Sequence, residues 1–216
     1  NLNPTIRAAC TALQSRGWVV AINTVNNIGS VVSEYALSFN GTDEYVDCGT
    51  AIGDALGDNY AGDLTVSMWF KAHVTGGDDG LFTIGNFGTS SGPFNIRMTG
   101  SIEYRLNVSG WTRSVSFSDT SNWNHLVCVY KSGSEADSKM YLNGVSVGST
   151  TGTFPAAADM DLDGLDTVIG AYYSASYAFD GDIDEVAIWD EALDADAVAD
   201  VYNSGSPTNL LENEGR

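Results

Sequence analysis

The chain has 216 residues, of which 43% are hydrophobic and 11% aromatic, so it can bury a sizeable core and is not a disordered protein. It carries 28 acidic against 9 basic residues, a formal charge of -19. This charge argues against nucleic-acid binding, which needs a basic face. No apolar run approaches the length of a membrane span, so we predict no membrane insertion.

The first 33 residues differ in pattern from the rest. Residues 3–16 are predicted to form a helix, with Asn3 as its N-cap and Pro4 in its first turn, and residues 18–22 a buried strand. A helix followed by a Gly-Trp-Val strand resembles the last unit of a solenoid repeat, and a helix packed on the next domain is the alternative. We predict that residues 1–33 end a preceding module and that the chain is a piece of a longer protein.

From residue 34 to 205 the pattern changes to short alternating segments separated by turn residues. Residues 64–71 alternate, so Leu64, Val66, Met68 and Phe70 share one face of a strand. Asn143-Gly144 predicts a tight hairpin turn between two further strands. The other predicted strands include 81–84, 94–98, 103–108 and 111–117. Many short strands at regular spacing indicate an all-β protein, an antiparallel sandwich of two sheets.

The last predicted element is a short helix at residues 194–203. Asp194 is placed to cap its N-terminus, and Gly205 and Pro207 end it. The polar residues 206–216 are predicted to be a linker or tail.

Four motifs, in this order, carry a family resemblance. They are residues 36–46, residues 64–70, residues 123–145, and the Asp-Gly-x-Ile-Asp-Glu-Val-x-Ile-Trp segment at 180–189 with its following helix. Together they resemble laminin G-like domains of the concanavalin A-like lectin/glucanase superfamily, over about residues 34–205. The resemblance implies a jelly-roll sandwich with the short C-terminal helix, and it implies much less about function, because one fold hosts many functions.

Acidic residues near the last predicted strand suggest a calcium site. Asp180, Asp182 and Asp184 alternate, so an extended chain places their carboxylates on one side, where they repel unless a cation or hydrogen-bond donors satisfy them. A solvated strand start is the alternative. The family resemblance implies a structural calcium that joins the first and last strands, with Asp43 and Asp184 as ligands and Asp180 as a further candidate.

Strand alternation also predicts a polar strip that can bind a ligand. Asn95 and Arg97 oppose the apolar face of one strand, and Glu103, Arg105 and Asn107 do so on the next. If a three-residue turn joins the strands, Arg97 lies opposite Glu103 and Asn95 opposite Arg105. Amide, guanidinium and carboxylate groups in one strip suit sugar hydroxyls. An ordinary solvated sheet face with one ion pair is the alternative.

Aromatic side chains in loops offer platforms on which a sugar ring can stack. Trp111 follows a predicted turn, and Tyr172 and Tyr173 cluster with Tyr177 before the last strand. Packing of these tyrosines within the loops is the alternative interpretation.

Catalytic patterns are weaker. Related glucanases carry a Glu-x-Asp-x-x-Glu pattern or a close variant, whereas residues 182–185 lack the first glutamate and place Glu185 on the wrong face. His125 alternates with apolar residues and is predicted to be packed. Cys48 and Cys128 are predicted to be free buried thiols, with a bridge between them as the alternative. We therefore predict that the chain is not an enzyme.

The predicted function is recognition or attachment. We expect the chain to bind glycans or a surface protein as part of a larger secreted, cell-surface or virion protein, and hence to be extracellular, at a cell surface or on a virion. A structural or fibre module that contacts neighbouring subunits, forming a homo-oligomer through the parent protein, is the alternative. A glycan hydrolase is the third hypothesis.

Overall fold

The computed structural model describes residues 36–85, 92–106, 110–157, 159–172 and 175–207. The predicted helix and strand within residues 1–33, and nearly all of the predicted tail, lie outside these ranges. No helix in the described ranges has the length and apolar character needed to span a bilayer.

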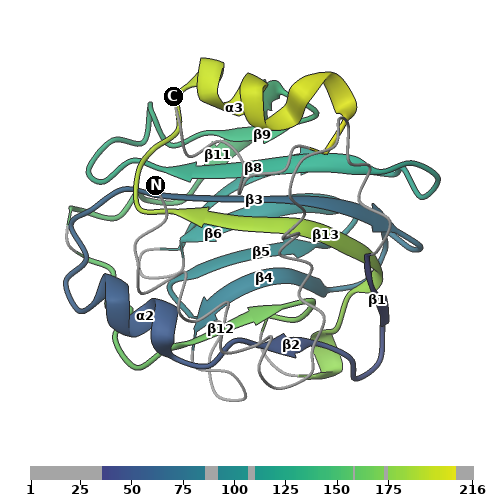
Figure 1. The fold of residues 1–216 in the computed structure, drawn as a ribbon. Coiled ribbons are helices and arrows are strands. Elements are labelled where there is room, and N and C mark those ends of the chain that lie inside the picture. Colours follow the sequence, from purple (N-terminus) through teal and green to yellow (C-terminus); the bar gives the residue numbers. More distant parts are fainter. Residues whose placement is uncertain (1–35, 86–91, 107–109, 158, 173–174, 208–216) are drawn as a thin grey trace, which may run out of the picture.

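The described strands form two antiparallel sheets, as the sequence predicts (Figure 1). The six-stranded sheet has, in spatial order, β1 (Leu37–Asn40), β13 (Asp180–Trp189), β3 (Leu64–Ala72), β8 (Asn124–Tyr130), β9 (Met140–Leu142) and β10 (Val145–Val147). The seven-stranded sheet has β11 (Ser149–Thr151), β7 (Trp111–Ser116), β6 (Ser101–Leu106), β5 (Phe94–Met98), β4 (Asp79–Gly85), β12 (Asp166–Ile169) and β2 (Val46–Asp47).

The core lies between the two sheets and follows the predicted alternation. In β3, Leu64, Val66, Met68 and Phe70 all belong to this core and are fully buried. The predicted hairpin at Asn143-Gly144 is also confirmed, because β9 and β10 pair across it and both turn residues have positive φ, at 53° and 76°. The prediction of an all-β sandwich is therefore confirmed, and so is the predicted inward face of β3.

Two α-helices and two short 3₁₀ segments complete the described fold. The predicted C-terminal helix is α3 (Ala195–Tyr202), and the Asp194 side chain accepts a hydrogen bond from the Ala197 backbone N–H at 2.9 Å. The sequence did not predict α2 (Ala51–Leu56), because six residues are too few to show a helical period. The 3₁₀ segments are η1 (Ala175–Tyr177) and η2 (Asn203–Gly205).

Helix α3 covers part of the outer face of the six-stranded sheet. Val198 packs against Val127 and Val129 of β8 and Tyr141 of β9. Nearby, the His125 ring contacts both Trp69 and Tyr202, with ring centroids 5.0 and 5.8 Å away. His125 is only 1% exposed, and the prediction of a packed histidine is confirmed.

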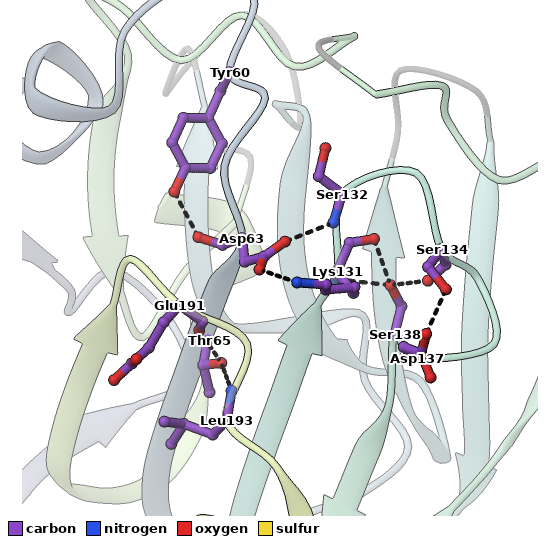
Figure 2. Close-up of polar contacts among 10 residues, drawn as sticks. All are labelled: Tyr60, Asp63, Thr65, Lys131, Ser132, Ser134, Asp137, Ser138, Glu191 and Leu193. Atoms are coloured by element: carbon purple, nitrogen blue, oxygen red, sulfur yellow. Dashed lines mark hydrogen bonds and ion pairs between the residues drawn. The ribbon is translucent and has the colours of Figure 1, made fainter.

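A polar network fixes the loops at one end of the six-stranded sheet (Figure 2). The Asp63 carboxylate accepts hydrogen bonds from Lys131 Nζ at 2.6 Å and from the Ser132 backbone N–H at 3.0 Å. The Thr65 hydroxyl donates to the Glu191 carbonyl at 2.7 Å and accepts from the Leu193 N–H at 3.1 Å. These contacts join the start of β3 to the β8–β9 connection and to the segment that leads into α3.

The first and last strands of the described fold pair side by side, as the sequence predicts. Strand β1 pairs antiparallel with β13, and Asn40 lies opposite Asp180.

Both described cysteines, Cys48 and Cys128, are free thiols, and burial raises the pKa of the Cys128 thiol. The disulfide alternative is not realised.

The buried His125 makes stability depend on pH. Burial lowers the pKa of its imidazole from 6.5 to about 4, so between these values the unfolded chain binds a proton that the folded chain excludes. Stability therefore decreases as the pH falls through this window, by up to roughly 1.4 kcal/mol per pH unit. Urea unfolding between pH 5 and 8 should show this slope in the wild type and a reduced slope in His125→Phe. Equal slopes would mean that His125 titrates normally in the folded state.

Candidate ligand-binding face

The β5–β6 hairpin has the predicted register. Arg97 lies opposite Glu103 and Asn95 opposite Arg105, and the last ladder pair before the turn joins Met98 to Ile102. The apolar residues of both strands face the core, so the charged residues lie on the outer face of the seven-stranded sheet. The sequence alone predicted this arrangement because alternation assigned the faces and the turn length fixed the pairing.

Arg97 is the centre of a hydrogen-bonded cluster on this face. Its Nε donates to Glu103 Oε2 at 2.9 Å, and its Nη1 donates to Asp78 Oδ1 at 2.8 Å and to the Tyr172 hydroxyl at 3.3 Å. The guanidinium carbon also lies 5.5 Å from the centre of the Tyr172 ring. We call Asp78, Arg97, Glu103, Arg105 and Tyr172 the polar cluster.

The acceptors around Arg97 are fixed by further bonds. Glu103 Oε1 accepts from the Thr99 hydroxyl at 3.0 Å, and the Tyr172 hydroxyl donates to Asp78 Oδ2 at 2.9 Å. Burial alone would lower the pKa of Arg97, but the bonds to Glu103 and Tyr172 outweigh it and raise that pKa. Burial likewise raises the pKa of Tyr172. The cluster is therefore a charged network with its side chains held in place.

Arg105 differs from Arg97 in having few contacts. Its Nε lies 4.0 Å from Glu103 Oε2, and its guanidinium makes no hydrogen bond within the described ranges. Its side chain is 24% exposed. Burial and the nearby Arg97 lower the pKa of its guanidinium.

Hydroxyl side chains extend the face beyond the hairpin. Thr112 and Ser114 of β7 lie opposite Arg105 and Glu103, and β11 continues both rows with Thr151 and Ser149. We did not identify these residues as site residues from the sequence. Alternation in β7 could have identified them. Arg113 lies on the same side of the strand as Trp111, which places Thr112 and Ser114 on the opposite, outer side.

Two residues predicted as ligand contacts are buried. Asn95 occupies the predicted pairing position but is fully buried in the structure. Trp111 is also fully buried, and its ring packs edge-on against Tyr104 and Phe154 in the core. Trp111, the predicted sugar platform, is therefore a core residue. It is the first residue of β7, and the alternation of that strand turns its side chain toward the core.

Tyr172, which we predicted as a stacking platform, is mostly buried within the polar cluster. Tyr172 is only 6% exposed, with its ring 5.0 Å from that of Tyr177 and with Arg97 beside it. It positions charged groups and does not offer an open stacking surface. The predicted contacts Asn107 and Tyr173 lie outside the described residues. Asp78, which pairs with Arg97 at 2.8 Å, was missed because loop residues have no periodicity that assigns a face.

The three predicted calcium ligands lie along β13 and the turn after β1. Asp43 Oδ1 accepts from Asn40 Nδ2 at 2.9 Å, and Asn40 lies opposite Asp180, so Asp43 and Asp180 belong to the same end of the β1–β13 pair. Asp184 lies four residues further along β13, roughly 13 Å at the rise of an extended strand.

One oxygen atom of each of these acids already has a protein partner. Asp180 Oδ1 lies 3.0 Å from His73 Nδ1, and Asp184 Oδ1 accepts from the Glu185 backbone N–H at 2.8 Å. Within the described ranges, no three His, Cys, Asp or Glu residues are grouped as metal ligands. Carboxylate and turn carbonyl oxygens still suit calcium chemically, so calcium binding remains a prediction.

Strand β13 contains one strained acidic residue. Glu185 has a φ of 48° and lies at a register shift between Asp184 and Ala187. Burial and the adjacent Asp184 raise the pKa of its carboxyl group to about 7.

Comparison with known proteins identifies the family. A family model described as "Concanavalin A-like lectin/glucanases superfamily" matches residues 40–199. No curated protein sequence matches the chain.

Several solved structures have the same fold at low sequence identity. The IT-sialidase CBM40 domain of Ruminococcus gnavus, bound to alpha2,3 sialyllactose, has 17% identity and a TM-score of 0.61 over 81% of this chain and 100% of that chain. Domain 4 of AbnA, an extracellular arabinanase from Geobacillus stearothermophilus in complex with arabinotriose, has 18% identity and a TM-score of 0.51 over 84% of each chain.

A third similar structure is much longer. The NanB sialidase of Streptococcus pneumoniae has 22% identity and a TM-score of 0.57, and the match covers 81% of this chain but 27% of the sialidase chain. The present chain thus spans about a quarter of that protein. At these identities the similarities establish the fold alone.

The polar cluster should contribute to stability through its least exposed pair. The Arg97 and Glu103 side chains are 18% and 19% exposed, so replacing Glu103 by Gln removes the less exposed of the two counter-charges of a largely buried guanidinium. We expect Glu103→Gln to reduce the free energy of unfolding by about 1–3 kcal/mol. Asp78→Asn, at a carboxylate that is 44% exposed, should cost under about 1 kcal/mol. Urea unfolding measures both variants, and a larger loss in Asp78→Asn would contradict this ranking.

Proposed function

Since the chain belongs to the concanavalin A-like lectin/glucanase superfamily, we propose that it is a non-catalytic glycan-binding module. The observation that carries this proposal is the polar cluster on the outer face of the seven-stranded sheet. Its guanidinium, carboxylate and phenol groups are held by hydrogen bonds of 2.8–3.3 Å. These bonds hold the face in one arrangement, so a sugar that binds beside the cluster does so without a large cost of ordering side chains.

The neighbouring hydroxyl rows support the same face. Thr112 and Ser114 are short and partly exposed, and they continue the rows of Arg105 and Glu103 across the sheet. Short side chains beside charged ones leave room for a sugar chain to lie across the strands. Two of the similar structures are also complexes with oligosaccharides, sialyllactose and arabinotriose.

We place this module within a larger secreted, cell-surface or virion protein, where it would attach the parent protein to a glycan-bearing surface. A structural module that contacts neighbouring subunits remains the alternative, and it predicts self-association without glycan binding.

We also propose that the module binds calcium at the end of the β1–β13 pair, through Asp43 and Asp180 with carbonyl oxygens of the turn after β1. Calcium there would link the first and last described strands and stabilise the fold by mass action, about 2.7 kcal/mol at a hundredfold excess over the dissociation constant. The melting temperature should rise with added CaCl₂ and return with EDTA. The rise should disappear in Asp43→Asn, and an identical melting temperature under all conditions would refute the calcium site.

A blocked sheet face tests the glycan-binding proposal. Ser114→Trp places a large ring beside Glu103, whereas Ser146→Trp places the same ring on β10 of the other sheet, opposite Tyr141. On a glycan array with plant, bacterial and animal saccharides, we expect Ser114→Trp to lower binding by at least about tenfold. Ser146→Trp should bind as the wild type does.

Other outcomes of the array separate the alternatives. Equal binding by both tryptophan variants would move the site away from this face. Silence of the wild type across the array, combined with a defined oligomer in size exclusion, would favour the structural module. Release of reducing sugar from any bound glycan would establish a hydrolase.

A further inference from the structure

Arg97 of β5 and Arg105 of β6 lie on the same sheet face, and Arg105 pairs with Asn95, two residues along β5 from Arg97. The two guanidinium groups differ in how many of their N–H groups already have acceptors. Arg97 uses Nε and Nη2 on Glu103, at 2.9 Å each, and Nη1 on Asp78 and Tyr172. A guanidinium has five N–H groups, so these contacts leave almost none for a ligand. Arg97 is therefore built into the protein.

The groups around Arg97 are largely occupied too. Glu103 accepts bonds on both oxygens, from Arg97 and from Thr99. The Tyr172 hydroxyl both accepts from Arg97 and donates to Asp78, and the tyrosine is only 6% exposed. None of these three residues offers a free donor or a free negative charge of its own.

Arg105 is the member of the polar cluster with free donors. Its contact with Glu103, at 4.0 Å, is longer than a hydrogen bond, and its guanidinium makes no hydrogen bond within the part of the chain that the structure describes. The side chain is 24% exposed, which leaves the N–H groups half desolvated yet reachable from solvent. Burial and Arg97 both disfavour its charged form, and a bound anion would offset that cost.

The charges beside Arg105 do not oppose an anion. Glu103 and Asp78 are each paired with Arg97, at 2.9 and 2.8 Å, so the cluster has two positive and two negative side chains. Most of the overall charge of -19 lies elsewhere, and at physiological ionic strength it is screened beyond about 8 Å. A ligand at Arg105 therefore meets a local field that is close to neutral, next to a cation whose ion pair with Glu103 is long, at 4.0 Å.

We propose that Arg105 is the residue that contacts the ligand and that it selects glycans carrying a carboxylate, such as uronic or sialic acid units, while Arg97 only positions the cluster. This inference rests on the proposed glycan-binding function. A guanidinium is a donor-only group whose planar fork matches the two oxygens of a carboxylate. Thr112, opposite Arg105, can serve a neighbouring sugar hydroxyl.

Matched pairs of saccharides test the ligand class. The 216-residue chain is titrated by calorimetry with oligogalacturonides and with their methyl esters, and with sialyllactose and its methyl ester, so that the members of each pair differ only in the charge of the carboxylate. We expect at least one acid to bind roughly ten- to a hundredfold more tightly than its neutral partner.

Three charge variants test the residue. Arg105→Gln should remove the preference for the acid, and Arg105→Lys should retain part of it, because lysine keeps the charge and loses the fork. Lys139→Gln removes one positive charge next to β9 of the other sheet and should leave binding unchanged. Unfolding curves that match the wild type would show that the loss in Arg105→Gln is local.

Each outcome gives a definite result. Equal affinity for acid and ester, or acid preference that survives in Arg105→Gln, overturns the inference but leaves the glycan-binding proposal standing. Absence of binding to these pairs, together with a silent glycan array, overturns both. Loss of acid preference in Lys139→Gln as well would show that overall charge, and not Arg105, sets the selectivity.

Discussion

The ion pair between Arg97 and Glu103 is the interaction on which the polar face depends. Because the two residues lie opposite each other on β5 and β6, the backbone ladder holds them in contact. Asp78 and Tyr172 then reach the same guanidinium from segments 19 and 75 residues away. One arginine thus fixes two loops relative to the sheet. The same saturation leaves Arg105 as the cation with free donors.

The two sheets have different outer faces. On the six-stranded sheet, α3 and the stacked rings of Trp69, His125 and Tyr202 bury the surface. On the seven-stranded sheet, β6 and β7 keep charged and hydroxyl side chains partly exposed. In Figure 1, α3 lies beside β8 and β9, whereas β4, β5 and β6 belong to the other layer. The outer face of β6 and β7 therefore offers polar contacts to a ligand without a helix packed over it.

The parts of this site that follow strand periodicity could be predicted from the sequence. Alternation and a short turn were sufficient for the Arg97–Glu103 register, and the β1–β13 pairing followed from the family resemblance. Burial on the outer face could not be predicted in this way. Asn95 has the phase of a solvent-facing residue but is fully covered, since periodicity says nothing about what packs over a sheet.

Contacts made by loop residues could not be predicted from the sequence either. Asp78 precedes β4 in a glycine-rich segment, and nothing in its local pattern points to Arg97. For Trp111 the sequence held two indications. Its alternation with Arg113 and Val115 assigns it to the core, whereas its position after a turn suggested an exposed sugar platform, and the structure buries it. Alternation was the better guide wherever the two indications disagreed.

Side-chain NMR of the arginine Nε–Hε groups tests the central claim most directly. In the free protein, we expect a slowly exchanging Hε for Arg97, held by Glu103, and a rapidly exchanging one for Arg105. Addition of a carboxylate-bearing oligosaccharide should shift and protect the Arg105 signal while leaving Arg97 nearly unchanged. A ligand that shifts Arg97 and spares Arg105, or that perturbs only residues around α3, would contradict the account.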